Sequence, residues 1–162
     1  MGMDLDLIKV ICCDVDGSLT DGTYEINELG IISKIFHTRD FYALNKMMQL
    51  GYQVIILTSA SDKVIERKCE NFDFLLYTGV ENKQEEMARI LKSMNLKWEN
   101  LGYIGDAEND LDVMQNAGWT ACPLDAIPEV VEFSNYQSVH NGGHGAVYDS
   151  LRKFCDYQSI DW

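Results

Sequence analysis

Two acidic groups of residues lie directly after short apolar segments of the sequence. Asp14 and Asp16 follow residues 7–13, and a second group follows residues 101–104 and consists of Asp106, Asn109 and Asp110. Carboxylates held close together raise one another's pKa and destabilise a fold unless a positive charge compensates them. A hard divalent cation is the natural compensation, and Mg²⁺ suits an oxygen-rich site that also takes up phosphate oxygens. These residue types therefore predict a Mg²⁺ site that admits a phosphate.

Three further polar residues are candidates for holding the phosphate oxygens. Thr58 and Ser59 follow the apolar residues 54–57, and Lys83 stands at the start of an expected helix. Each of them alone is more often structural, because a hydroxyl at a strand end bonds to the backbone and a helical lysine is usually solvated. Chemistry is indicated because all these polar groups occupy corresponding positions along the chain.

Two other interpretations of the same residues fit less well. Asp14, Asp16 and Glu25 have the spacing of a calcium-binding loop, but Leu19 stands where that loop needs glycine. A phosphorylation-receiver domain also gathers carboxylates, a threonine and a lysine on parallel strands. Its acidic residues are neighbours after the first strand and its nucleophile follows a later strand, which is not the order found here.

The apolar segments are expected to be the strands of one sheet. Three are short and continuous, as in strands buried on both faces, and two are weaker: residues 7–13, 54–57 and 101–104, then 74–77 and 119–121. Helical periodicity lies between and after them, over residues 41–50, 62–71, 85–94, 111–117 and 145–157. This alternation predicts an α/β fold with a doubly wound, mostly parallel sheet. Because ligands bind at the carboxyl ends of such strands, the polar groups should meet at one edge.

One segment departs from the alternation of strands and helices. Residues 23–26 and 31–36 flank the sequence from Asn27 to Gly30, which predicts a β-hairpin inserted over about residues 23–36. The hairpin carries more apolar side chains than a solvated one should. Since a two-stranded hairpin is marginally stable alone in water, we expect it to pack against a partner.

The composition is that of one globular domain, over residues 1–162. Thirteen Lys and Arg against 26 Asp and Glu give a net charge of −13, which disfavours nucleic acid and anionic membranes as partners. The five cysteines form no Cys-x-x-Cys pair, which indicates reduced thiols. Residues 1–6 lack the basic start and apolar stretch of a signal peptide, so we expect a cytoplasmic protein.

At these residues the sequence resembles the haloacid dehalogenase superfamily of phosphotransferases. The four signature elements of that superfamily match Asp14-x-Asp16, Thr58, Lys83 and the segment from Gly105 to Asp110. The sequence is similar, over roughly residues 7–152, to a branch without a cap domain. This branch comprises the 3-deoxy-manno-octulosonate 8-phosphate and nonulosonate 9-phosphate phosphatases, and further matches to it lie at residues 16–22, 36–40 and 142–147.

The resemblance implies a role for each matching residue. Asp14 would be the nucleophile that forms an aspartyl-phosphate, and Asp16 the acid and then the base. Mg²⁺ would be held by the carboxylates of Asp14 and Asp106 and the backbone carbonyl of Asp16, with Asn109 and Asp110 in support. The phosphoryl oxygens would be held by Thr58, the backbone near Ser59, and Lys83.

Three positions differ from the pattern of this branch and concern the substrate. Phe41 replaces a glycine, and Lys68 and Tyr148 replace arginines. We expect the Phe41 ring to stand beside the pocket. The candidate substrate contacts are Arg39, Asp40 and Lys68.

The resemblance also implies an assembly. In the capless branch, hairpins of several subunits come together and a neighbouring chain helps to cover each active site, so we expect a homotetramer. The expected function is hydrolysis of a phosphorylated sugar acid. The alternative is a catalytically idle oligomerisation domain that partners a sugar-activating cytidylyltransferase, although such a domain would be expected to lack the nucleophile or the metal ligands.

Overall fold

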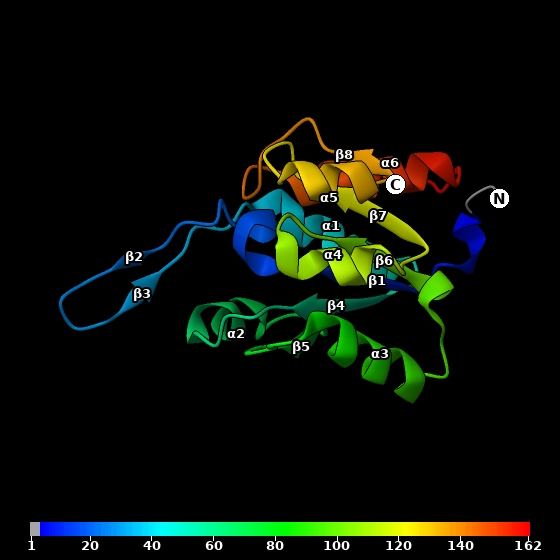
Figure 1. Cartoon of the computed structure of the whole chain (residues 1–162). Helices are drawn as coiled ribbons and strands as arrows, with labels where there is room; N and C mark the ends of the chain where they lie inside the picture. Colours follow the sequence, from blue (N-terminus) through cyan, green and yellow to red (C-terminus); the bar gives the residue numbers. More distant parts are fainter. Residues whose placement is uncertain (1–3) are drawn as a thin grey trace.

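The computed structural model describes residues 4–162 and is built on one six-stranded sheet (Figure 1). The strand order is β5-β4-β1-β6-β7-β8, and every pairing between neighbours is parallel. The strands are β1 (Val10–Cys13), β4 (Gln53–Leu57), β5 (Leu75–Tyr77), β6 (Leu101–Ile104), β7 (Trp119–Cys122) and β8 (Tyr136–Gln137). The expected parallel α/β sheet is confirmed. Residues 1–3, part of the segment weighed above as a signal peptide, lie outside the described residues.

Helices cover both faces of this sheet. They are α1 (Thr38–Gln49), α2 (Lys63–Cys69), α3 (Lys83–Ser93), α4 (Glu108–Met114), α5 (Pro128–Phe133) and α6 (Ala146–Tyr157). Side chains of β1 alternate between the two faces, as strand geometry requires. Ile11 and Cys13 pack in the core beneath α1 and α6, whereas Val10 and Cys12 pack in the core beneath α3, α4 and α5. Both faces of the central strand are therefore buried, which explains its unbroken apolar sequence.

Several element boundaries differ from the sequence-based expectation. β1 begins at Val10 rather than at residue 7, because Leu5–Leu7 form a short 3-10 turn. α1 begins at Thr38, three residues earlier than its apolar periodicity indicated. The helix α5 and the edge strand β8 were not predicted, since six and two residues are too few to show a period.

The predicted hairpin protrudes from the sheet (Figure 1). Its antiparallel strands, β2 (Glu25–Ile26) and β3 (Ile32–Ser33), are shorter than expected. Asn27 closes the turn, because its Oδ1 accepts hydrogen bonds from the N–H groups of Leu29 and Ile31. Large apolar side chains stay exposed along the hairpin: Tyr24, Ile26, Leu29, Ile31 and Ile35.

Two other expectations concern the chain as a whole. All five cysteines are buried and free, as expected of reduced thiols. Within residues 4–162, no helix has both the length and the apolar character needed to cross a membrane.

Candidate active site

The carboxyl ends of three neighbouring strands bring the predicted residues together. β1 lies between β4 and β6, in a register that places Cys13 beside both Ile56 and Ile104. Asp14 follows at once, and its N–H donates to the carbonyl of Ile104 at 3.0 Å. Thr58 is the first residue after β4, so the shared register places it at the same edge.

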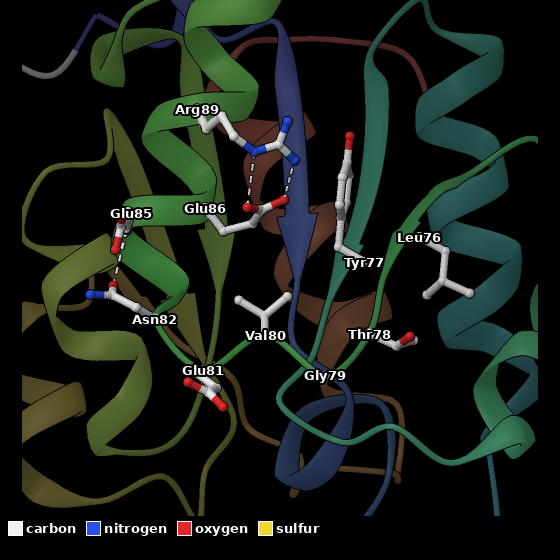
Figure 2. Close-up of a pocket in the computed structure, with 10 residues that line it drawn as sticks. All are labelled: Leu76, Tyr77, Thr78, Gly79, Val80, Glu81, Asn82, Glu85, Glu86 and Arg89. Atoms are coloured by element: carbon white, nitrogen blue, oxygen red, sulfur yellow. Dashed lines mark hydrogen bonds and ion pairs between the residues drawn. The ribbon is translucent and has the colours of Figure 1, made fainter.

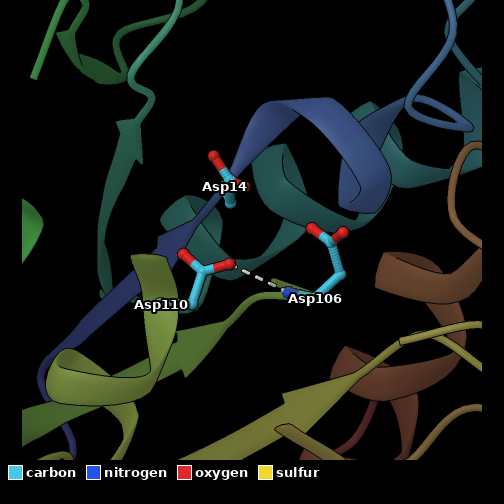
Figure 3. A group of neighbouring side chains, drawn as sticks. All are labelled: Asp14, Asp106 and Asp110. Carbon is cyan, nitrogen blue, oxygen red and sulfur yellow. Dashed lines mark hydrogen bonds between the residues drawn. The ribbon is translucent and has the colours of Figure 1, made fainter. Parts of the chain in front are cut away.

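Three carboxylates converge at this edge (Figure 3). Asp14, Asp106 and Asp110 each offer one oxygen, and these oxygens lie within 4.8 Å of one another. Burial and the charge of Asp110 raise the pKa of Asp14 far above its usual value. The same two causes raise the pKa of Asp106 to about 7. Carboxylates in such surroundings ionise fully only when a cation compensates their charge, and the donor set of this cluster is all oxygen, as Mg²⁺ prefers.

Lys83 supplies one of the compensating charges. It is the first residue of α3, a helix whose start is capped by Asn82 Oδ1 accepting from the N–H of Glu85. Lys83 Nζ lies 2.8 Å from Asp14 Oδ1 and 2.7 Å from Asp110 Oδ1. Burial alone would lower the pKa of Lys83, but the two carboxylates outweigh it and raise that pKa, so the ammonium group stays charged.

Asp110 is fully engaged by protein donors. Its Oδ1 accepts from Lys83 Nζ and from the Tyr103 hydroxyl, the latter at 2.6 Å. Its Oδ2 accepts from the N–H groups of Asp106 and Ala107 at 3.0 and 3.2 Å. This geometry fits the supporting role expected of Asp110, which orients Lys83 and the loop of Asp106. Tyr103 was missed by the sequence analysis, although a hydroxyl in a strand buried on both faces is a signal for a buried polar partner.

Glycines let the loop after β1 approach Asp106. Gly17 has φ +95°, and a Cβ there would lie 2.0 Å from Asp106 Oδ2. Ser18, which was not predicted, donates from Oγ to Asp106 Oδ1 at 3.3 Å. Gly142 packs on the outside of the same loop, where a Cβ would lie 1.8 Å from the Gly17 carbonyl oxygen. The close packing explains why small residues occur at both positions.

Thr58 and Ser59 follow β4, and Asn109 lies in the first turn of α4. Thr58 is buried, and its Oγ1 accepts from the N–H of Ala60 at 3.2 Å. Asn109 Nδ2 donates to Ser59 Oγ at 3.1 Å. This bond connects the loop after β4 to the first turn of α4, which also carries Asp110.

Asp16 lies apart from the three-carboxylate cluster. Its carboxylate pairs with Lys34 of the hairpin, with Nζ 2.8 Å from Oδ1 and 2.9 Å from Oδ2. Lys34 Nζ also lies 2.7 Å from Asp62 Oδ2. Burial would lower the pKa of Lys34, but the hydrogen bonds to the two carboxylates outweigh it and raise that pKa. Lys34 and Asp62 were missed by the sequence analysis, because nothing in the local sequence pairs a hairpin lysine with either carboxylate.

The three candidate substrate contacts differ in burial, since Arg39 is exposed, Lys68 is half-buried and Asp40 is buried. Asp40 is buried, its Oδ1 accepts from the N–H of Tyr148 at 2.8 Å, and burial raises its pKa to about 6. Arg39 is exposed on α1. Lys68 Nζ lies 4.4 Å from the centre of the Phe41 ring. That ring is 2% exposed and part of the core, so the expectation that it stands beside the pocket was wrong.

A wide pocket of about 770 Å³ lies at the end of β5 and the start of α3 (Figure 2). One wall carries Glu86 and Arg89, which form an ion pair across one turn of the helix. Neither the three clustered carboxylates nor Asp16, Thr58 or Lys83 line it. The pocket is therefore separate from the candidate site.

Comparison with known proteins agrees with this fold. The family model of the haloacid dehalogenase-like hydrolases matches residues 32–118. A 3-deoxy-D-manno-octulosonate 8-phosphate phosphatase (KdsC) of Salmonella typhi is 31% identical over 150 residues, which cover 92% of this chain and 78% of that protein. The chain belongs to the haloacid dehalogenase-like hydrolase family.

Solved structures of family members share the fold. The 3-deoxy-D-manno-octulosonate 8-phosphate phosphatase of Moraxella catarrhalis, in complex with magnesium, phosphate and KDO, has a TM-score of 0.91 at 26% identity, covering 96% of this chain and 90% of that chain. The cobalt-bound deoxy-D-mannose-octulosonate 8-phosphate phosphatase (YrbI) of Haemophilus influenzae has a TM-score of 0.89 at 27% identity, covering 96% and 91%. The chain is thus a phosphatase of this family, and the alternative of an idle oligomerisation domain receives no support.

Proposed function

We propose that this phosphatase is a Mg²⁺-dependent phosphomonoesterase that acts on a phosphorylated sugar acid, either 3-deoxy-octulosonate 8-phosphate or a nonulosonate 9-phosphate. The observation that carries the proposal is the pairing of buried Lys83 with both Asp14 and Asp110, beside Asp106. In this arrangement the Asp14 carboxylate lies beside the ammonium group of Lys83 and beside carboxylates that can hold a cation. The ammonium group and the cation are the two positive charges that a bound phosphate needs. The names of the related phosphatases support the substrate class.

The residues that would hold Mg²⁺ are the carboxylates of Asp14 and Asp106 and the backbone carbonyl of Asp16. Asp110 would support the site from behind, because both of its oxygens are already bonded to protein donors. Asn109 would support it through the loop that it bonds to Ser59. When bound, the cation supplies positive charge that neutralises phosphate oxygens.

Asp14 and Asp16 would divide the covalent chemistry. A carboxylate oxygen of Asp14 attacks phosphorus, the bond from phosphorus to the sugar oxygen breaks, and Asp16 gives its proton to the departing oxygen. Asp16 then takes a proton from a water molecule that attacks the aspartyl-phosphate, which releases inorganic phosphate and restores Asp14. The Asp16 side chain is 35% exposed, so a water molecule can reach its carboxylate.

The phosphoryl oxygens would be held by Thr58, Ser59 and Lys83. Lys83 is fixed by Asp110 so that its ammonium group stays beside the nucleophile. Fixed donors of this kind stabilise the charge of the transition state without having to reorganise. Contacts of Arg39, Asp40 and Lys68 with the sugar acid remain predictions, and the burial of Asp40 favours a structural role for it.

We further propose that the phosphatase is a homotetramer held by its hairpins, located in the cytoplasm. Leu29 and Ile35 of the hairpin are 78% and 84% exposed, and Tyr24, Ile26 and Ile31 are more than half exposed. So much apolar surface on one protruding hairpin favours burial against other subunits.

The test is inorganic phosphate release from a panel of sugar phosphates that includes both proposed substrate types. The panel is run with Mg²⁺, with EDTA, and with the Asp14→Asn variant, and Asp112→Asn on the exposed side of α4 serves as the matched control. We expect release that requires Mg²⁺, persists in the control and is abolished in Asp14→Asn. Release that survives both EDTA and Asp14→Asn would refute the mechanism, and a preference for neutral sugar phosphates would refute the substrate class.

A further inference from the structure

The hairpin delivers one buried cation to the edge of the site. Lys34 follows β3 directly, and its side chain is only 3% exposed, although the apolar residues around it on the hairpin face solvent. Its ammonium group bridges two carboxylates, those of Asp16 and Asp62. A lysine is buried in this way only when its charge is paired, so the two contacts determine where the side chain lies.

Lys34 contacts both oxygens of the Asp16 carboxylate. Both oxygens of Asp16 lie within 2.9 Å of the one ammonium nitrogen, and Oδ1 also lies 3.4 Å from Thr20 Oγ1. Asp16 is only two residues from Asp14, yet its carboxylate remains outside the cluster formed by Asp14, Asp106 and Asp110. A carboxylate without such a partner would be free to turn toward the site and compete for the cation.

The orientation places Asp16 at a pocket where a leaving group has room. This pocket, of about 540 Å³, is lined by Asp16 and Lys34 together with Tyr24 and Ile32 of the hairpin and Ser61 of the loop after β4. Two of its lining residues, Asp16 and Ala60, come two positions after Asp14 and Thr58 of the candidate site, and its walls mix polar with apolar side chains. The alcohol that departs from a phosphate ester would therefore be released on the side of Asp16 that the pocket exposes.

Asp62 in turn holds Lys34. Asp62 is the N-cap of α2, where its Oδ1 accepts from the N–H of Val64 at 3.1 Å, and its Oδ2 is left for Lys34. The start of α2 thus fixes Asp62, Asp62 fixes the ammonium group, and the ammonium group fixes Asp16. This sequence of contacts connects the hairpin and the loop after β4 to one carboxylate.

From this geometry we propose that Lys34 is a positioning residue, which holds Asp16 where it can protonate the leaving group. The inference rests on the proposed function, because it assigns to Asp16 the role of acid. It goes beyond that function because it makes the hairpin part of the catalytic arrangement of its own subunit, in addition to any role in assembly.

The leaving group of the substrate provides the test. An alkyl phosphate needs a proton on its departing oxygen, whereas an aryl phosphate such as p-nitrophenyl phosphate departs without one. In the Lys34→Met variant, kcat/KM for a hydrolysed sugar phosphate should fall on the order of 10–100-fold, since general acid catalysis contributes roughly 10²–10⁴. With p-nitrophenyl phosphate, kcat/KM should stay within about threefold of the unchanged enzyme, because it reports only the steps up to departure of the leaving group.

Three further variants make the test specific. Lys34→Arg keeps the bridging cation and should restore most of the sugar phosphate activity. Asp62→Asn keeps the cap of α2 but loses the ion pair with Lys34. It should therefore lower kcat/KM selectively for the sugar phosphate, by a smaller factor than Lys34→Met does. Lys63→Met, which removes an exposed charge from the first turn of α2, should leave kcat/KM unchanged for both substrates.

The outcomes separate this proposal from the one on which it rests. If the wild-type enzyme is active, an equal loss of kcat/KM on both substrates in Lys34→Met, or no loss on either, would overturn only the role of Lys34. A selective loss in Lys63→Met as large as that in Lys34→Met would also overturn it, because the effect would then be one of net charge. Absence of activity of the wild type on both substrates would overturn the proposed function and this role with it.

Discussion

Replacing Lys83 by methionine tests whether one ammonium group allows two buried carboxylates to share the site. Lys83 Nζ lies 2.8 Å from Asp14 Oδ1 and 2.7 Å from Asp110 Oδ1, and none of the three side chains is more than 6% exposed. At an effective dielectric constant near 20, each pair attracts by about 6 kcal/mol. Most of that attraction is offset by the cost of burying the charges, so what matters is the charge left unpaired. Removing the cation alone should therefore lower the free energy of unfolding by about 3–5 kcal/mol at pH 8.

The loss is measured by urea denaturation in EDTA, so that no added cation can compensate the carboxylates. Lowering the pH to 5.5 should reduce the loss, since carboxylates without a cationic partner take up protons more readily. Lys92→Met, on the exposed side of the same helix, is the matched control and should stay within about 0.5 kcal/mol of the wild type. Adding Asp110→Asn to Lys83→Met removes one unpaired charge, so the double variant should lose less than the sum of the single losses.

A loss below about 1 kcal/mol at pH 8 would refute this reasoning, because uncompensated burial of two carboxylates costs more than that. Strict additivity of Lys83→Met and Asp110→Asn would refute it as well, since groups in contact are expected to couple.

Asp40, Gly17 and the hairpin provide three further tests. Burial raises the pKa of Asp40 to about 6 from 3.8, so its contribution to stability is lost as pH rises through 6. The free energy of unfolding of Asp40→Asn, measured by urea denaturation relative to the wild type, should therefore rise by about 1.4 kcal/mol between pH 5 and pH 8. If the free energies of unfolding of the two proteins changed in parallel with pH, this reasoning would be contradicted. Gly17→Ala should lower kcat/KM about 100-fold or more, because the new Cβ would displace Asp106, and near-normal turnover would argue against that contact. Changing Ile26 and Ile31 together to Glu should reduce the mass measured by light scattering from tetramer to smaller species, whereas a wild-type monomer at micromolar concentration would disprove the assembly.

The sequence by itself determined the fold class and the residues that follow its strands. Unbroken apolar segments indicated strands buried on both faces, and their alternation with helices indicated parallel pairing. Parallel strands align their carboxyl ends, so Asp14, Thr58 and Asp106 could be placed at one edge without coordinates. Lys83 could be assigned to the start of a helix beside that edge, and the structure brings its ammonium group to Asp14.

Only the tertiary structure decided which side chains position these groups. Lys34 lies 18 residues from Asp16 and 28 from Asp62, and no local periodicity relates a hairpin to a loop at such distances. Asp40 was predicted from the sequence to contact the substrate, but the fold buries it against the start of α6, where it accepts from the N–H of Tyr148. Positions after a strand are set by backbone register, which the sequence encodes locally, whereas partners across the site are set by packing of segments far apart in the chain.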